Sequence, residues 1–508
     1  MMPPDRDHIL AIDQGTTSTR AVIYDARLRP VGQGQVEVPP TYPRPGWVEH
    51  DPAAILASVT ATVELALAGA NLDPGRVAAI GLTNQRETTV VWDRATGRAI
   101  APAIVWQDRR TGDFCERHRD SRPWLAERTG LVLDPYFSAT KIAWLLDHVP
   151  GARARADAGE LAAGTVDSWL IWHLTGGSQH VTDATNASRT LLMDLRSLAW
   201  ADDLCSFFAV PPAILPAIRP SVADFGATRG FPGLPDGLPI RGVAGDQQAS
   251  LAGQGCLASG QAKCTYGTGA FLLAHTGDRV VPSTRGLVTT LAASLDGGAP
   301  QYALEGSVFI AGAAVQWFRD GLRAVGAAAE VDRLSEQADP ESGVLFVPAL
   351  TGLGAPHWEP EARGTLFGLT RATSVADLAR ATLEGVAFQI SDLIDAMNAD
   401  LVSPMTDLRV DGGMARSDPF LRFQADLLNL ELHRSPQTES TALGAALLAG
   451  LGVGLWPDPT TAVELIESSG EKFRPARDDA WRAATLGRWR HAVATVRGHY
   501  AKLPGQAN

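Results

Sequence analysis

The segment ILAIDQGTTSTRAVIY, residues 9–24, predicts a β-hairpin with a short polar turn, and the rest of the chain is interpreted from it. An apolar run ends at Asp13, the turn GTTS follows, and a run rich in β-branched residues begins at Ala21. The amides and hydroxyls of such a turn form a concavity of donors, which is a typical phosphate site. An ordinary Asp/Gly/Thr hairpin turn is the alternative for this segment alone.

The polar residues of this segment suit three chemical roles. Gly15 would let the backbone approach a ligand closely. Asp13, at the end of the first strand, suits a carboxylate that holds Mg²⁺ through water, and Arg20 adds a fixed positive charge. The hydroxyls that would surround a phosphate belong to Thr16, Thr17 and Ser18.

Length and composition indicate a large globular protein. At 508 residues the chain is long for a single core, which predicts two domains. Hydrophobic residues make up 45% and charged residues 20%, and the net charge is −12, so a nucleic-acid or anionic-membrane surface is not expected. A negatively charged ligand such as ATP must therefore be met by local donors and Mg²⁺.

The cysteines and the apolar runs point to a cytoplasmic protein. The N-terminus lacks a signal-peptide pattern, and the uncharged run 441–457 is shorter than the roughly 20 residues that a membrane span needs. We therefore expect no membrane insertion. No CxxC or other ligand-like spacing occurs, which predicts free and mostly buried thiols at Cys115, Cys205, Cys256 and Cys264.

The order of predicted elements begins again near residue 255. A strand at 240–244 leads into a helix that starts at Asp246, and strands at 261–266 and 270–275 then form a second hairpin around GTG. Strands at 287–295 and 302–304 and a helix at 307–322 follow. We expect an α/β fold with two domains, residues 1–254 and 255–508, that show weak internal repetition.

Two glycine hairpins, one in each half, would hold a polyphosphate from opposite sides. The second turn consists of Gly267, Thr268 and Gly269, and the sequence DGG at residues 411–413 offers a third close approach of backbone to ligand. Closure of the two halves would exclude water from the reaction. The GxxxxGK[ST] phosphate loop is absent.

Asp246 is the candidate general base, since it follows an apolar strand and lies where the halves should meet. It would orient an acceptor hydroxyl toward the γ-phosphate. A carboxylate with an ordinary pKa of about 3.9 is a weak base, but a loose phosphoryl-transfer transition state asks little of it. A helix N-cap is the structural alternative.

Arg86 and Glu87 lie between two predicted strands, where loop residues often carry function. In a pocket they would supply a donor fork and an acceptor for vicinal hydroxyls, whereas on the surface they would be a solvated ion pair. Trp106, Tyr136 and Phe271 are candidates for contact with the C–H edges of a polyol, or else core residues.

Many ordered motifs together resemble the FGGY carbohydrate kinases over essentially the full chain, most closely the members that phosphorylate glycerol. The segments that carry the resemblance include IDQGTTSTRAVIYD, LTNQRETTVVWD, AIVWQDRRT, LVLDPYFSATKIAWLLDH, GVAGDQQASLAGQ, TYGTGAF, EGSVFIAGAAVQWFRD, VPALTGLGAPHW and RVDGGMARSD.

The resemblance implies two actin-like, RNase-H-type domains that flank a central cleft, with ATP, Mg²⁺ and glycerol as ligands, sn-glycerol 3-phosphate as product, and a homodimer or homotetramer. By position it assigns Asp246 as base and Asp13 to the metal. It assigns to glycerol Arg86, Glu87, Trp106, Tyr136, Asp246, Gln247 and Phe271. It assigns to the nucleotide Thr16, Thr17, Ser18, Arg20, Thr268, Gly312, Gln316 and Gly413.

Two departures from the family pattern matter. Ser417 stands where these kinases commonly carry Asn, so its contact with the adenosine side would be made by a shorter group. The segment FPGLPDGLP has no Lys or Arg where some bacterial members bind fructose 1,6-bisphosphate, so we expect no such regulation. A kinase for another small polyol or ketose, and a non-catalytic ATP-binding module like actin or Hsp70, are the alternative functions.

Overall fold

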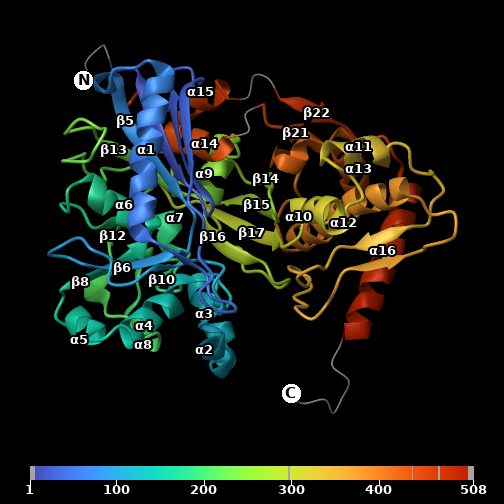
Figure 1. The fold of residues 1–508 in the computed structure, drawn as a ribbon, viewed down its shortest axis with the longest axis horizontal. Coiled ribbons are helices and arrows are strands. Elements are labelled where there is room, and N and C mark those ends of the chain that lie inside the picture. Colours follow the sequence, from blue (N-terminus) through green and yellow to red (C-terminus); the bar gives the residue numbers. More distant parts are fainter. Residues whose placement is uncertain (1–5, 296–297, 437–438, 467–469, 501–508) are drawn as a thin grey trace.

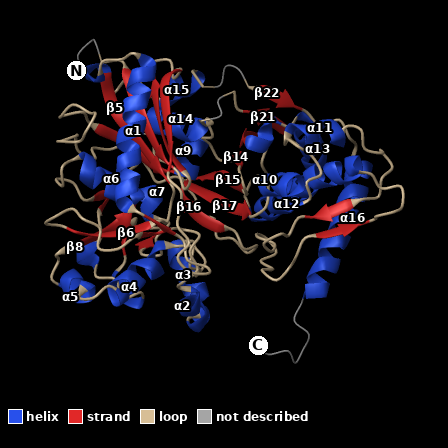
Figure 2. Ribbon diagram, in the orientation of Figure 1, coloured by secondary structure: helices blue, strands red, loops and turns tan. Residues whose placement is uncertain are grey.

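The computed structural model describes residues 6–295, 298–436, 439–466 and 470–500, which form two lobes (Figure 1). Strands occupy the centre of each lobe and helices lie outside them (Figure 2). The first sheet has the order β13 (Ile240–Gly245), β5 (Val77–Asn84), β1 (His8–Gln14), β2 (Ser18–Tyr24) and β3 (Pro30–Glu37). The second has the order β16 (Val288–Leu291), β17 (Tyr302–Val308), β15 (Ala270–Gly277), β14 (Gln261–Tyr266), β20 (Asp407–Gly412), β21 (Glu431–Arg434) and β22 (Glu471–Phe473).

Five strands of each sheet have the same connectivity. Strand β1 pairs antiparallel with β2 and parallel with β5, and β14 pairs antiparallel with β15 and parallel with β20. An outer antiparallel strand and an outer parallel strand extend both sets, namely β3 and β13 in the first lobe and β17 and β21 in the second. The predicted internal repetition and both predicted glycine hairpins are confirmed.

Helices from both halves of the sequence cover the first sheet. Helix α1 (Pro52–Ala70) begins where the Asp51 side chain accepts a hydrogen bond from the Ala53 amide at 2.9 Å, and its apolar side packs into the core below β1 and β2. The opposite face is covered by α14 (Ser440–Gly452), which packs on β5, and by α15 (Pro459–Glu464), which packs against α14. The domain division at residue 254 stays a prediction, because these helices come from the second half of the chain.

Helix α1 is the one described helix that is long and apolar enough to cross a membrane by length and composition. Its buried residues include Ile55, Val59 and Val63, which belong to the core of the first lobe. Core packing therefore accounts for the apolar composition of this helix.

The seam between the lobes is formed by α9 (Asp246–Gly253) and α14, whose backbones approach closely. A Cβ atom on Gly444 would lie 1.8 Å from the Ala249 carbonyl oxygen, and one on Gly253 would lie 2.0 Å from that of Ser440. Glycine is therefore required at both positions. Helix α9 also packs against β14 and β15, so this helix pair joins the first sheet to the second.

A small sheet extends the first lobe beside the seam. Its order is β4 (Glu49–His50), β7 (Ala103–Ile104), β6 (Thr89–Asp93) and β8 (Leu161–Thr165). The helices around it include α2 (Gly112–Arg117), α3 (Arg122–Thr129), α4 (Ser138–His148), α5 (Ala152–Asp157), α6 (Val166–Leu174), α7 (Ala184–Ala187) and α8 (Asp202–Phe207). The loops of this extension carry several of the predicted polyol contacts.

The second lobe is organised around α12 (Val375–Asp400), which begins at a capping box formed by Ser374 and Asp377. Its core joins the second sheet to α12, α13 (Asp418–Leu428) and α16 (Asp479–Tyr500), with α10 (Gly312–Gln316) and α11 (Ala329–Ser335) beside them. A two-stranded sheet of β18 (Leu345–Val347) and β19 (Thr365–Phe367) packs on α12.

Some predicted elements have the wrong bounds, including the helix at 307–322 and the strand at 287–295. The predicted helix at 307–322 begins only at Gly312, because Ser307 and Val308 continue β17 and pair with Phe271 and Ala270. The predicted strand at 287–295 is limited to β16, where pairing with β17 ends. In both cases cross-strand pairing, which the local pattern does not report, decides the structure. The four cysteines are buried and free, as expected.

Candidate active site

The tip of the first hairpin lies against an indole ring. The Gly15 amide donates to the Ser18 carbonyl oxygen at 2.9 Å, which closes the turn. The indole Nε1 of Trp106 donates to the hydroxyl of Thr16 at 2.8 Å. Trp106 therefore connects a predicted phosphate contact to the loop that follows β7.

Arg86 and Glu87 are buried, which excludes the alternative of a solvated surface pair. The Nε atom of Arg86 lies 3.1 Å from Oδ1 of Asp246, and the side chain of Arg86 is only 2% exposed. Glu87 has a φ of +61°, in the left-handed region that non-glycine residues rarely adopt. The chain holds both charges in a fixed arrangement at the seam.

Two further charged residues, which the sequence motifs do not indicate, complete this cluster. Glu305 on β17 binds Arg86 through two hydrogen bonds, at 2.5 Å and 3.0 Å. Arg189, which follows α7, donates to Glu305 at 2.9 Å and to Glu87 at 2.7 Å. Burial opposes the charge on Glu305, but the guanidinium groups of Arg189 and Arg86 outweigh it and lower the pKa of this carboxyl to about 2.

Sequence signals for these two residues exist but are weak. Glu305 is a lone acid in the buried strand YALEGSV, and Arg189 is a lone base in a small-residue segment. A buried charge requires a partner, so either residue signals an ion pair once burial is known. Because Glu305 comes from the second sheet and Arg86 from the first lobe, the cluster ties the two lobes together.

Asp246 and Asp13 supply the negative charge of the site. Asp246 is the first residue of α9, its Oδ1 accepts from the Gln247 amide at 2.7 Å, and its side chain is 30% exposed, so a ligand can reach it. Asp13 lies on β1, close enough to Asp246 for the two carboxylates to repel each other. Burial, followed by repulsion from Asp246, raises the pKa of Asp13 to about 7, and Arg20 opposes this shift.

Tyr136 forms an aromatic wall with Trp106, since the two rings meet edge to face with centroids 5.5 Å apart. The loop that carries Tyr136 is held by Lys141 of α4, whose ammonium group donates to the carbonyl oxygens of Pro135, Tyr136 and Phe137. A cavity between the lobes is lined by Tyr136, Arg189 and Glu305 together with Phe309 and Trp358. Among the described residues, Asp246 and Phe271 do not line this cavity.

The second hairpin is in contact with the start of α10. The Gly267 carbonyl oxygen accepts from the Gly312 amide at 2.9 Å, and that of Thr268 accepts from Ala311 at 2.9 Å. Gly412 has a φ of +87°, and a Cβ there would lie 2.4 Å from the Tyr266 carbonyl oxygen. The structure thus brings together Gly312, Thr268 and the backbone that leads to Gly413.

Two other predicted ligand contacts, Arg20 and Ser417, bind protein groups. Arg20 forms an ion pair with Glu439, just before α14, and donates to Gln35 at 2.8 Å. Ser417 caps α13 and donates to Asp332 at 2.6 Å. Gln316 ends α10, and Phe271 lies on β15 opposite Thr265 and Ser307. The nucleotide roles of Arg20 and Ser417 stay predictions.

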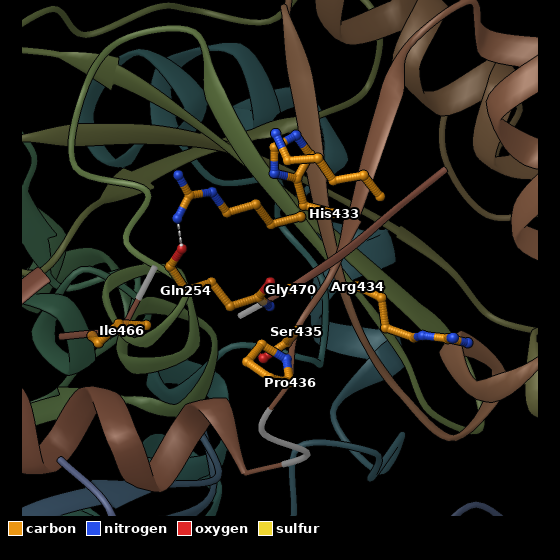
Figure 3. Close-up of a pocket in the computed structure, with 9 residues that line it drawn as sticks. Gln254, His433, Arg434, Ser435, Pro436, Ile466 and Gly470 are labelled. Carbon is orange, nitrogen blue, oxygen red and sulfur yellow. Dashed lines mark hydrogen bonds between the residues drawn. The ribbon is translucent and has the colours of Figure 1, made fainter. Parts of the chain in front are cut away.

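A separate cavity lies where β20, β21 and β22 meet the end of α9 (Figure 3). It is lined by basic residues that include His433, Arg434 and Lys472, but these are matched by acids. Glu431 contacts both His433 and Lys472, at 2.9 Å each, and Arg434 pairs with Asp418 at 2.8 Å. This cavity contains none of the predicted site residues, and its charge is compensated.

Solved structures with this arrangement are two-domain kinases with an actin-like α/β fold, which confirms the predicted fold class. A glycerol kinase from Plasmodium falciparum, solved with ADP, has a TM-score of 0.90 and 37% identity and covers 96% of this chain and 98% of its own. A gluconate kinase from Lactobacillus acidophilus, at 23% identity and a TM-score of 0.85, covers 97% and 98% and shares the fold.

The sequence comparisons give the family. Residues 8–253 match the N-terminal domain, and residues 262–453 the C-terminal domain, of the FGGY family of carbohydrate kinases. The chain belongs to this family. A glycerol kinase from Methylobacterium nodulans is 54% identical over 502 residues, covering 98% of this chain and 99% of its own. One from Paracidovorax citrulli is 51% identical over 500 residues, covering 96% and 98%.

Proposed function

We propose that this chain transfers the γ-phosphoryl group of ATP to glycerol and forms sn-glycerol 3-phosphate. Relatives at 51% and 54% identity over nearly the whole chain are glycerol kinases, and a structure at 37% identity is a glycerol kinase with ADP. The observation that carries the proposal is the seam cluster, where Glu305 fixes Arg86 with its Nε atom 3.1 Å from the accessible carboxylate of Asp246.

The acceptor would bind beside this cluster. Arg86 supplies hydrogen-bond donors and Glu87 an acceptor for neighbouring hydroxyls, and both are rigid because their charges are buried and paired. The edge-to-face pair of Trp106 and Tyr136 offers an apolar wall for C–H groups. Gln247 adds an amide next to Asp246, and Phe271 would face the carbon chain from the second sheet.

Asp246 would act as general base for the acceptor hydroxyl. Its carboxylate is reachable, and its contact with Arg86 fixes its orientation. Because charge neutralisation and alignment supply most of the acceleration in phosphoryl transfer, the hydroxyl proton leaves late and the step does not require a strong base.

The triphosphate would lie between the two hairpins, with Thr16, Thr17, Ser18 and Arg20 on one side and Thr268, Gly312, Gln316, Gly413 and Ser417 on the other. Asp13 fits a role in holding Mg²⁺, because its carboxylate is desolvated and repelled by Asp246, a situation that a divalent cation relieves. When bound, Mg²⁺ would neutralise charge on the transferring phosphoryl group.

An ADP-release assay coupled to NADH oxidation tests the proposal with glycerol, dihydroxyacetone, erythritol, xylulose and gluconate as acceptors. We expect glycerol to give the highest kcat/KM, with product identified as sn-glycerol 3-phosphate. Preference for a ketose would redirect the assignment to another FGGY kinase. ADP release that does not depend on any acceptor would favour a non-catalytic ATP-binding module.

The setting of the reaction belongs to the same proposal. ATP as donor and four free thiols are consistent with a cytoplasmic location. We propose a homodimer or homotetramer, which light scattering on the purified protein tests. Fructose 1,6-bisphosphate should leave the rate unchanged, because the segment 231–239 offers no basic side chain to hold its phosphates.

A further inference from the structure

Lys263 is a fully buried lysine on β14 at the seam between the lobes, and none of the roles described above uses it. Its ammonium group donates to Oε1 of Gln247 on α9 and, at 3.0 Å, to the hydroxyl of Thr265. A buried ammonium group needs such partners, because its desolvation is costly. Burial lowers the pKa of Lys263, although Asp411 and Asp246 favour its charged form. The lysine thus connects the second sheet to the residue that follows Asp246.

The contact fixes which end of the Gln247 carboxamide faces inward. An ammonium group can only donate hydrogen bonds, so the oxygen of the carboxamide must point to Lys263 and the NH₂ group must point away from it. Within the described residues, Nε2 of Gln247 makes no hydrogen bond of its own. Gln247 directly follows the candidate base, and its backbone N–H donates to the Asp246 carboxylate at 2.7 Å. The side-chain NH₂ group of Gln247 therefore lies on the residue next to the base.

The same lysine begins a polar path across the seam. The Thr265 hydroxyl lies 3.5 Å from that of Ser250 on α9, which lies 2.9 Å from the hydroxyl of Ser440 on α14. Ser440 in turn donates to Asp411 on β20, next to the glycine pair on the nucleotide side. Lys263 is therefore held from both lobes, which restricts the position of its ammonium group.

We propose that Lys263 is a positioning residue that presents the Gln247 NH₂ group to a hydroxyl of the acceptor and so adds to the selection of a polyol over alcohols with fewer hydroxyls. The inference rests on the proposed function, in which Gln247 contacts glycerol. Lys263 does not touch the substrate. Without the lysine, the carboxamide rotates or flips, and the acceptor hydroxyl loses a fixed donor.

A double-mutant cycle of Lys263→Met and Gln247→Met tests this coupling, with glycerol, 1,2-propanediol and 1,3-propanediol as acceptors. Each single variant should raise KM for glycerol about tenfold, as expected for one lost hydrogen bond, and leave KM for ATP unchanged. The double variant should be no worse than Gln247→Met alone, because Lys263 acts through Gln247. The ratio of kcat/KM for glycerol to that for at least one of the two diols should decrease to a similar extent in both single variants and in the double variant.

The matched control is Lys472→Met, which removes a lysine from the half-exposed β22 and should leave every constant unchanged. Multiplying effects in the double variant, to about a hundredfold, would overturn the inference, since independent sites behave additively in free energy. A wild-type protein that releases no ADP with glycerol would instead remove the proposed function itself.

A second variant keeps the test decisive if Lys263→Met does not fold. Gln247→Glu still accepts from Lys263 but has no NH₂ group for the acceptor, and an ion pair at this position favours the folded state. We expect it to melt at or above the wild-type temperature and to show the same rise in KM for glycerol as Gln247→Met. Wild-type KM and wild-type discrimination in Gln247→Glu would refute the proposed donor role.

Discussion

The two lobes place the same pair of residue types at the same place in their sheets, but in exchanged positions. In the first lobe Asp13 on β1 pairs with Thr83 on β5, and in the second Thr265 on β14 pairs with Asp411 on β20. The acid thus lies on the hairpin strand in one lobe and on the neighbouring parallel strand in the other. The shared topology does not give the two acids the same surroundings.

The surroundings of Asp13 suit a role in the reaction, whereas those of Asp411 suit a role in stabilising the fold. Burial and repulsion from Asp246 oppose the negative charge of Asp13, and the charge of Arg20 offsets them only in part. Asp411 is 5% exposed, accepts a hydrogen bond from Ser440 of α14 and lies near Lys263. We therefore expect the first lobe to contribute acids to the reaction, and the acid of the second lobe to hold the seam.

The largest effect is expected at Asp246, which begins α9 directly after β13 of the first sheet. Asp246→Asn keeps an oxygen for the contact with Arg86 but removes the base, so turnover should decrease about 10³-fold while KM for glycerol changes less than about threefold. Steady-state kinetics with glycerol and ATP, and glycerol binding by calorimetry, check this. An equal loss of glycerol binding would remove the assignment of Asp246 as base.

The exchanged acids are compared by Asp13→Asn and Asp411→Asn. Asp13→Asn should lower kcat about 100-fold and raise the Mg²⁺ concentration needed for half-maximal rate. Asp411→Asn should mainly lower the free energy of unfolding, by about 1–3 kcal/mol, because Asp411 is a buried hydrogen-bonded group. Titrations with Mg²⁺ and urea unfolding measure the two effects. The opposite pattern would reverse the roles that we give to the two acids.

The pH dependence of Asp13 gives an independent check in the absence of Mg²⁺. Its pKa is raised from 3.8 to about 7, so the native state keeps a proton that the unfolded chain releases. Stability should therefore fall as the pH rises from about 4 to 7, and Asp13→Asn should remove this loss. Thermal unfolding in EDTA should show that the melting temperature of the variant, relative to that of the wild type, is higher at pH 8 than at pH 5. An excess of Mg²⁺ should reduce this difference.

The glycines of the second hairpin also differ from one another. A Cβ on Gly269 would lie 2.6 Å from the Val308 carbonyl oxygen, whereas one on Gly267 has no atom closer than 3.7 Å. Gly269→Ala should therefore lower the free energy of unfolding by about 1–3 kcal/mol, and Gly267→Ala by less than about 0.5 kcal/mol. Urea unfolding without nucleotide compares them. Equal effects would mean that β17 shifts to accept the methyl group.

The sequence could predict most of the fold and about half of the seam cluster. Glycine turns between apolar runs identified both hairpins, because turn chemistry is local. Glu305 and Lys263 were not selected, since a lone charge in an apolar strand does not reveal its partner. Their roles depend on pairing between β17 and β15 and between β14 and α9, which are contacts between segments distant in sequence. The same non-local pairing explains why the helix predicted at 307–322 begins only at Gly312.

The smallest expected effect concerns the contacts that hold the two hairpin turns in place. A side chain holds the first turn, whereas backbone amides hold the second. Trp106 donates its indole N–H to Thr16, while Thr268 and Gly267 are held by amides of α10 and its preceding residue. Trp106→Phe keeps the aromatic contact with Tyr136 but removes that donor, so KM for ATP should rise about threefold and KM for glycerol should change less. Steady-state kinetics over both substrates check the split. A rise confined to glycerol would mean that the indole N–H serves the acceptor, and that the first hairpin keeps its shape without it.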